Sequence, residues 1–215
     1  MENIELIVLS FTRTGGDKVV VHTLSRAYGR RAFLVHGFKK ATKACFLPLA
    51  IVEADVAENP RSSLATLRGL QLKEALADIR SDLYKNIMTI FLGEVLLRIL
   101  PEGNVEEGLY DWTLSRILTL EALEGESANF PVWFLLDLAG ALGFRPSWDD
   151  VAPFAKGHET ALKPFLEQDF AACMLLPLTG AVRSGLCACL LDYLSFHTGQ
   201  TLQVNSLEIL RTVLE

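Results

Sequence analysis

The spacing of apolar residues changes near Leu76, and this change limits the possible folds more than any other feature of the chain. Before it, short runs rich in β-branched residues alternate with turns that contain glycine. After it, apolar residues recur every three or four positions, the period that a helix places on one face. The sequence therefore predicts an α+β protein with strands first and helices second.

Five strands are expected in the first part of the chain. They fall at residues 4–9, 19–21, 31–36, 48–56 and 64–70, and Gly15-Gly16-Asp17 has the composition of a hairpin turn. Short strands at this spacing are typical of a small barrel. We therefore expect an N-terminal OB-fold β-barrel in residues 1–77, followed by an all-α helical domain in residues 78–215.

The helical part is predicted from the same periodicity. Helices are expected at residues 79–96, 109–123, 130–142, 181–197 and 207–214. Pro146, Pro153 and Gly157 predict a loop over residues 145–163.

Charge divides the chain in a similar way. The first 50 residues have eight bases and three acids, a net charge of +5, whereas the remainder has twelve bases and twenty-three acids, a net charge of −11. The overall charge of −6 averages two unlike parts and does not argue against binding to nucleic acid.

The basic part suggests contacts with DNA phosphates. Between Arg26 and Lys43, six cationic residues are interleaved with Tyr28, Phe33 and Phe38. Cations neutralise phosphates, and aromatic rings stack on unpaired bases without reading sequence. An equally simple alternative is that Phe33 fills the barrel while the lysines only solubilise a loop. The candidate DNA-binding residues are Arg13, Lys18, Arg26, Arg30, Arg31, Phe38, Lys39, Lys40 and Lys43.

Enzyme chemistry has little support. The chain has no P-loop, GxGxxG, HExxH or GxSxG motif. Cys187 and Cys189 lie near Asp192 and His197, but Asp192 and His197 are five positions apart and would point to different sides of a helix. One close cysteine pair is too few for a typical zinc site. We expect buried thiols, no metal, no cofactor and no catalytic residue.

No membrane segment is expected either. The most apolar stretches, such as residues 131–144, are shorter than the ~20 residues of a spanning helix. The first ten residues lack the features of a signal peptide. A cytoplasmic location is therefore predicted.

The order of several motifs resembles the RecO family of bacterial recombination mediators. Residues 7–18 resemble that family's first hairpin, and residues 23–29 with 34–40 are similar to its threonine-glycine and glycine-lysine pattern. Leu47 stands where the family usually has Gln in an apolar-Gln-Pro-Leu step. Residues 191–199 together with 206–210 are the most specific match.

This resemblance implies a non-enzymatic role in DNA repair. RecO-like proteins bind single- and double-stranded DNA, anneal complementary strands, contact the C-terminal tail of single-stranded-DNA-binding protein, and work with RecR so that RecA can load. The resemblance also implies a nucleoid-associated location. An acidic tail with apolar residues needs an apolar groove edged by a cation. The candidates in the helical part are Arg116, Arg145 and Arg183, the last of which matches a family arginine.

The departures from the family also carry information. Many relatives have a four-cysteine zinc site, which Cys173, Cys187 and Cys189 cannot supply, so none is expected here. Asn205 stands where the family often has Lys, and residues 145–163 show little likeness to it. Two other hypotheses remain beside the mediator: an interaction adaptor whose OB-like barrel has no DNA affinity, and a cysteine-dependent enzyme.

Overall fold

The computed structural model describes residues 2–37, 40–58, 60, 62–144 and 146–214. Contacts between residues divide the chain into two compact units. The first combines Met1–Ala77 with Leu100–Ile117, and the second combines Asp78–Ile99 with Leu118–Glu215. The first unit, here called the barrel unit, therefore includes a segment that comes after the first two helices of the chain.

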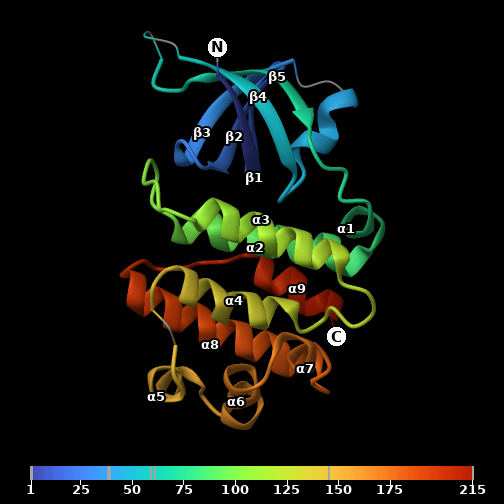
Figure 1. The fold of residues 1–215 in the computed structure, drawn as a ribbon, viewed down its shortest axis with the longest axis vertical. Coiled ribbons are helices and arrows are strands. Elements are labelled where there is room, and N and C mark those ends of the chain that lie inside the picture. The colour runs from blue at the N-terminus through green and yellow to red at the C-terminus, as the bar shows by residue number, and fades with distance from the viewer. Residues whose placement is uncertain (1, 38–39, 59, 61, 145, 215) are drawn as a thin grey trace. The chain divides into compact units, whose positions relative to one another are not determined.

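A closed barrel forms the body of the barrel unit (Figure 1). Its strands, as far as the chain is described, are β1 (Glu2–Gly15), β2 (Lys18–Ser25), β3 (Gly29–His36), β4 (Ile51–Ala57) and β5 (Thr66–Leu72). They follow the order β1-β2-β3-β5-β4, with β3 and β5 parallel and the other pairs antiparallel. A 3-10 helix, η1 (Lys40–Phe46), lies between β3 and β4. This topology confirms the predicted OB-fold.

The barrel interior is filled by alternating residues of its strands, because successive side chains of a strand point to opposite faces. On β1, Ile4, Leu6 and Val8 belong to the buried core. Val19 and Val21 of β2 and the ring of Phe33 on β3 meet them. The β-branched runs that predicted these strands therefore also supply the barrel core.

The segment from Leu100 to Ile117 is tied to β3 by its backbone. Gly103 donates its N–H to the carbonyl of Arg30 at 2.8 Å, and Arg30 pairs with Glu102 as an isolated β-bridge. At Gly29 (φ +59°) an added Cβ would lie 1.9 Å from the carbonyl oxygen of Asn104. Only glycine suits this position, because it permits both the left-handed backbone and the close approach.

The second unit, here called the helical unit, contains α1 (Ala77–Ser81) from Asp78 on, α2 (Leu83–Ile99) and the later helices. Those are α3 (Leu109–Ala122) from Leu118 on, α4 (Phe130–Ala141), α5 (Trp148–Val151), the 3-10 helix η2 (Ala152–Phe154), α6 (Glu159–Glu167), α7 (Phe170–Met174), α8 (Gly180–Thr198) and α9 (Ser206–Leu214). Helix α4 packs along α8, and α9 contacts both α2 and α8 (Figure 1). The fold thus confirms a helical part after the barrel.

Two predictions about the helices are wrong in detail. The helix expected over 79–96 is broken at Asp82, whose carboxylate accepts the N–H of Lys85 at 3.0 Å and so caps α2. The loop expected over 145–163 contains α5 and the start of α6. Ser147 and Asp150 form a capping box that begins α5 despite the prolines nearby.

None of the helices in the described residues has the length and apolar character needed to cross a membrane.

Candidate functional site

Exposed cations lie at the far end of the hairpin formed by β1 and β2. Every residue from Phe11 to Lys18 is exposed, including Arg13 on β1 and Lys18 at the start of β2. Gly15 pairs with Lys18 in the ladder, so the two strands meet at a tight turn. Lys18 makes no ion pair within the described residues. This end of the hairpin is therefore exposed and carries at least one lysine without an ion partner among the described residues.

Arg26 is placed differently, because it is held within the barrel unit. Its guanidinium donates to Oδ1 of Asp111 at 2.6 and 3.0 Å and to Oε1 of Glu5 at 3.3 Å, and it lies 4.3 Å from the ring centre of Tyr110. The hydrogen bond with Asp111, helped by the charges of Asp111 and Glu5, raises the pKa of Arg26. Arg26 thus joins the β2–β3 turn to the start of α3.

Arg30 and Arg31 on β3 also have partners within the chain. Nε of Arg30 donates to the carbonyl of Leu100 at 2.6 Å, and its guanidinium lies 3.7 Å from Glu102. Arg31 makes a two-pronged contact with Glu58 at 3.0 and 3.2 Å. Both arginines are therefore already partly neutralised.

Arg31 also covers an aromatic ring. Its guanidinium lies 4.8 Å from the ring centre of Tyr28 and 5.2 Å from that of Phe33. The Phe33 ring is buried in the barrel core, in agreement with the alternative in which it fills the barrel. Tyr28 is partly buried and packs edge-on against it, so the Phe33 ring offers no open face for stacking.

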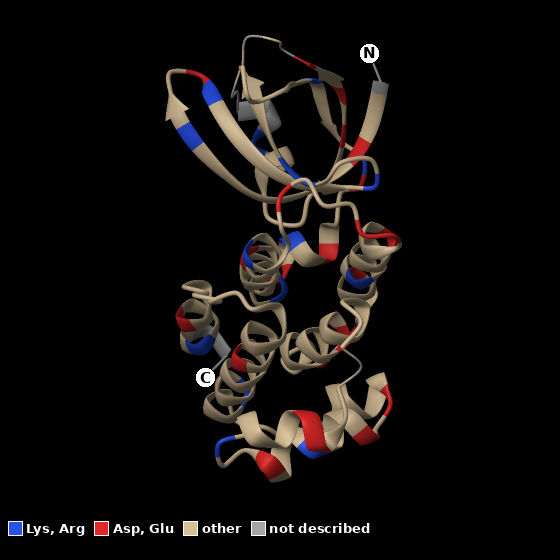
Figure 2. Cartoon of the chain, turned by 90° about the vertical axis from the view of Figure 1, so that its left-hand side faces the viewer, with Lys and Arg blue, Asp and Glu red and all other residues tan. Residues whose placement is uncertain are grey.

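Two further DNA-binding candidates, Lys40 and Lys43, belong to η1. Lys43 is exposed on this helix and has no ion partner within the described part of the chain. Phe38 and Lys39 lie outside the described residues, and the side chain of Lys40 is not described. Figure 2 shows basic and acidic residues mixed over the chain. Charge alone therefore does not distinguish a cation that is already paired with a carboxylate from one that is not.

Two further features of the barrel unit escaped the sequence reasoning. The ring of Phe11 is 38% exposed, although it packs against the buried ring of Phe46 with 5.7 Å between the ring centres. Arg68 on β5 is exposed and has no ion partner in the described chain. The signal available in the sequence for Phe11 is an aromatic residue two positions before Arg13.

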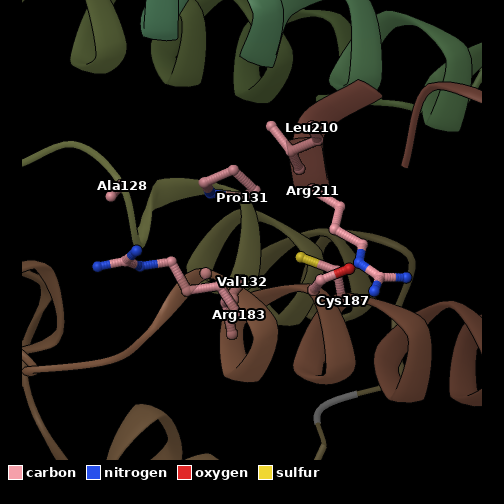
Figure 3. A pocket seen from close by; sticks show the side chains of 9 residues that line it. Ala128, Pro131, Val132, Arg183, Cys187, Leu210 and Arg211 are labelled. Atoms are coloured by element: carbon pink, nitrogen blue, oxygen red, sulfur yellow. The ribbon is translucent and has the colours of Figure 1, made fainter. Parts of the chain in front are cut away.

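The helical unit has a pocket between α4, α8 and α9, with about 230 Å³ of space that is partly open to solvent. Pro131, Val132 and Leu210 give it apolar walls. Figure 3 shows Arg183 on the Ala128 side of the pocket and Arg211 on the Leu210 side. This pocket combines an apolar floor with a cation at either side.

Asn129 holds Arg183 in this pocket. Its side-chain oxygen accepts from Nε of Arg183 at 2.8 Å, and its amide group donates to the carbonyls of Cys173, Met174 and Leu176. Burial lowers the pKa of Arg183, and the charge of Glu126 opposes this. Arg183 is therefore held at the Nε end of its guanidinium. Neither Asn129 nor Arg211 has a feature in the sequence that marks it as part of a site.

The other partner-binding candidates are not among the described residues that line this pocket. Arg116 lies in the barrel unit on α3, with its guanidinium 5.8 Å from the ring centre of Trp112. Arg145 lies outside the described residues. Of the three candidates, Arg183 alone lines the pocket as described.

The cysteines are buried thiols. Burial, with a smaller effect of Cys189, raises the pKa of Cys187 to about 12, which disfavours the reactive thiolate. Asp192 pairs with Lys156, and His197 stacks on Tyr193. No group of three or more His, Cys, Asp or Glu residues in the described chain is arranged to hold a metal ion.

The fold places the chain in the class of proteins that combine a closed OB-type barrel with a helical unit. Comparisons with known proteins identify the family. The model of "Recombination protein O C terminal" matches residues 80–153. "DNA repair protein RecO" of Azobacteroides pseudotrichonymphae is 23% identical over 91% of this chain and 92% of its own length.

Two other relatives share that name. The protein of Bacteroides fragilis is 30% identical over 67% of this chain and 61% of its own length. That of Porphyromonas gingivalis is 26% identical over 97% of each chain. The chain belongs to the RecO family of DNA repair and recombination proteins.

Proposed function

We propose that this protein is a non-enzymatic mediator of DNA repair and recombination. In this proposal it binds single- and double-stranded DNA, anneals complementary strands and, with RecR, helps RecA load onto DNA coated by single-stranded-DNA-binding protein. The observation that carries the proposal is a pair of exposed lysines on an OB-type barrel, Lys18 and Lys43, which have no ion partner among the described residues of a member of the RecO family.

Annealing needs no catalytic group. Two strands repel each other through their phosphates, and cations that neutralise both strands allow base pairing to proceed. An exposed cation without an internal carboxylate partner serves this purpose better than a paired one, because no ion pair has to be broken. We therefore assign the main DNA contacts to Lys18 and Lys43 and a lesser part to Arg26, Arg30 and Arg31, and on the sequence alone we retain Arg13, Lys39 and Lys40 as further candidates.

The experiment that tests DNA binding is an anisotropy titration with labelled single strands and duplexes at several salt concentrations. Affinity should fall steeply with salt, and neutralising three phosphates would give a log–log slope of about −2 for a single strand. A Lys18→Glu, Lys43→Glu variant should lose both affinity and annealing. Unchanged annealing in this variant would favour the adaptor without DNA affinity.

A matched control comes from a paired cation. An Arg31→Gln, Glu58→Gln variant removes this ion pair as a whole and leaves the net charge unchanged, so its loss of DNA affinity should be smaller than that of Lys18→Gln. Circular dichroism should first confirm that each variant is folded.

The pocket of the helical unit, here called the helical pocket, is the proposed binding site for the C-terminal tail of single-stranded-DNA-binding protein. An acidic and apolar peptide suits a pocket with apolar walls and two arginines. A peptide of that tail should bind the protein, and Arg183→Glu should weaken binding much more than Arg116→Glu. Equal effects of the two substitutions would argue against this pocket.

The same proposal includes the contacts with RecR and RecA and assigns DNA binding and partner binding to different parts of the chain. DNA contacts are assigned to residues 1–77 and partner contacts to residues 78–215, with a nucleoid-associated, cytoplasmic location. RecA loading on coated single strands, measured as RecA ATP hydrolysis, should require both this protein and RecR. Loading that proceeds equally well without this protein would contradict the mediator role.

A further inference from the structure

We propose that Asn129 is a positioning residue of the helical pocket: it holds Nε of Arg183, so that a carboxylate of the tail peptide binds end-on, at the two Nη groups. The tail peptide is a synthetic peptide with the sequence of the C-terminal tail of single-stranded-DNA-binding protein. This inference rests on the proposed function, and it gives a buried side chain a role in partner binding.

The side chain of Asn129 makes its hydrogen bonds outside its own helix. Asn129 is the N-cap residue of α4, where an asparagine side chain usually accepts a backbone N–H of the same helix, but it makes no such bond here. Its amide nitrogen instead donates to the carbonyls of Cys173, Met174 and Leu176 at 2.9, 3.2 and 2.9 Å. Carbonyl oxygens only accept, so the side-chain oxygen faces the other way, where Nε of Arg183 donates to it at 2.8 Å.

This contact determines which edge of the guanidinium remains available. A guanidinium can donate two parallel hydrogen bonds to one carboxylate either from Nε together with one Nη group, or from the two Nη groups. In Arg183 the hydrogen on Nε is already donated to Asn129, and the Nη groups have no partner within the described chain. A carboxylate that accepts two bonds therefore has to approach end-on.

Asn129 also keeps Arg183 away from a competing carboxylate. Burial lowers the pKa of Arg183 and the charge of the exposed Glu126 opposes this, so the two groups are near each other. No ion pair joins them within the described residues. A guanidinium released from Asn129 would be free to turn toward Glu126. Holding Nε therefore keeps the positive charge on the Ala128 side of the pocket, where Figure 3 shows the guanidinium.

The first test is Arg183→Lys, which keeps the positive charge but removes the planar edge. Affinity for the tail peptide, measured by fluorescence anisotropy, should fall about tenfold, because one ammonium group cannot donate two parallel bonds in this way. Arg116→Lys is the matched control and should change the affinity less than about twofold, because Arg116 is not among the described residues that line the pocket. Unchanged affinity in Arg183→Lys would overturn the inference.

Asn129→Ala tests the positioning role through a double-mutant cycle. It should lower affinity about tenfold in the unchanged protein but less than about twofold in Arg183→Lys, since lysine has a methylene group at the position of Nε. A purely structural role of Asn129 would lower affinity by the same factor in both proteins and would overturn the inference.

Asp169→Ala is the control for that structural role. Asp169 accepts the N–H of Ala172 at 2.9 Å and caps α7, so its loss loosens the segment that Asn129 also contacts but leaves Arg183 untouched. It should change peptide affinity less than about twofold, and a loss as large as that of Asn129→Ala would contradict the positioning role. Circular dichroism should first confirm that each variant is folded.

The binding edge can also be observed directly by NMR of the otherwise unchanged protein with isotope-labelled arginine, which does not depend on the folding of Asn129→Ala. The signals of Arg183 are identified by their loss in Arg183→Lys. The tail peptide should shift the Nη signals and slow their proton exchange, and it should leave the Nε signal nearly unchanged. A larger shift at Nε than at Nη would overturn the inference while leaving the proposed function intact. Absence of tail-peptide binding by the unchanged protein would instead overturn the tail-binding part of the proposed function.

Discussion

The hydroxyl of Tyr110 donates a hydrogen bond of 2.6 Å to the carboxylate of Glu5, joining residues 105 positions apart. The same carboxylate forms ion pairs with Arg26 and Lys73. Tyr110 is buried, so water cannot easily replace the phenol as a hydrogen-bond donor to Glu5 if this bond is lost. This contact helps to explain why the beginning of α3 belongs to the barrel unit.

Replacing Tyr110 by phenylalanine removes this hydrogen bond and little else. We expect the free energy of unfolding to fall by about 1–2 kcal/mol, since the bond has a charged acceptor. Urea denaturation of Tyr110→Phe against the unchanged protein measures this. Tyr84→Phe is the control, because Tyr84 is half exposed and its substitution should cost less than about 0.5 kcal/mol. Equal losses in the two variants would contradict a specific role for the bond.

Acid should weaken the barrel through Glu5. Burial alone would raise the pKa of Glu5, but hydrogen bonds from Lys73 and Tyr110 and the charge of Arg26 outweigh it, so the pKa lies below its ordinary value of 4.5. A carboxyl with a lowered pKa stabilises the fold above its ordinary pKa, and this contribution disappears as pH falls through the folded-state pKa.

The measurement is the stability of the unchanged protein and of Glu5→Gln as pH falls from about 6 towards 3. The unchanged protein should lose more stability over this range, because the variant has no carboxylate to protonate at this position. Parallel curves would show that Glu5 does not contribute to the acid sensitivity.

Gly29 should tolerate no side chain. In Gly29→Ala the new Cβ would lie 1.9 Å from the carbonyl oxygen of Asn104, and φ is +59°. We expect a loss of more than about 3 kcal/mol, from backbone strain and a backbone clash together. Gly16→Ala is the matched control, because φ is +61° there and nothing lies within 4 Å, so only the ~1 kcal/mol of strain applies. The difference between the two variants in loss of thermal stability measures the cost of the clash, because the backbone strain is similar in both.

The sequence predicted most elements because their signals are local. Periodicity identified the barrel strands and the long helices, and glycine marked the hairpin turn. The apolar periodicity did not indicate the break at Asp82, since a capping aspartate also fits on the polar face of a continuous helix. It missed the short helices after residue 145 because proline and glycine there suggested a loop, although a capping box was present.

The candidate site was less predictable, because availability of a cation depends on distant partners. Arg26 and Lys18 look alike in the sequence, yet Arg26 is paired with Asp111, 85 positions away, and Lys18 is not paired within the described chain. The exposure of Phe11 likewise depends on where Phe46 lies beneath it. Composition can count the charges of a segment, but only the tertiary structure shows which of them are already neutralised.

Helix α9 should depend on one carboxylate of α2. Glu94 accepts the backbone N–H groups of Asn205 and Ser206 at 3.1 and 2.9 Å and the Ser206 hydroxyl at 2.6 Å. These bonds satisfy donors at the beginning of α9 and place negative charge at its positive end. Burial alone would raise the pKa of Glu94, but the hydrogen bonds from Ser206 and Asn205 outweigh burial, so the pKa lies below its ordinary value.

We therefore expect Glu94→Ala to destabilise the protein by about 1–2 kcal/mol and to speed amide hydrogen exchange throughout α9. Glu94→Gln should have a smaller effect, because its amide oxygen still accepts one hydrogen bond. Glu208→Gln is the control for stability, since Glu208 is exposed on α9 and its carboxylate lies 3.9 Å from Arg211. Leu210 of α9 lines the helical pocket, so a frayed α9 in Glu94→Ala should also weaken tail-peptide binding.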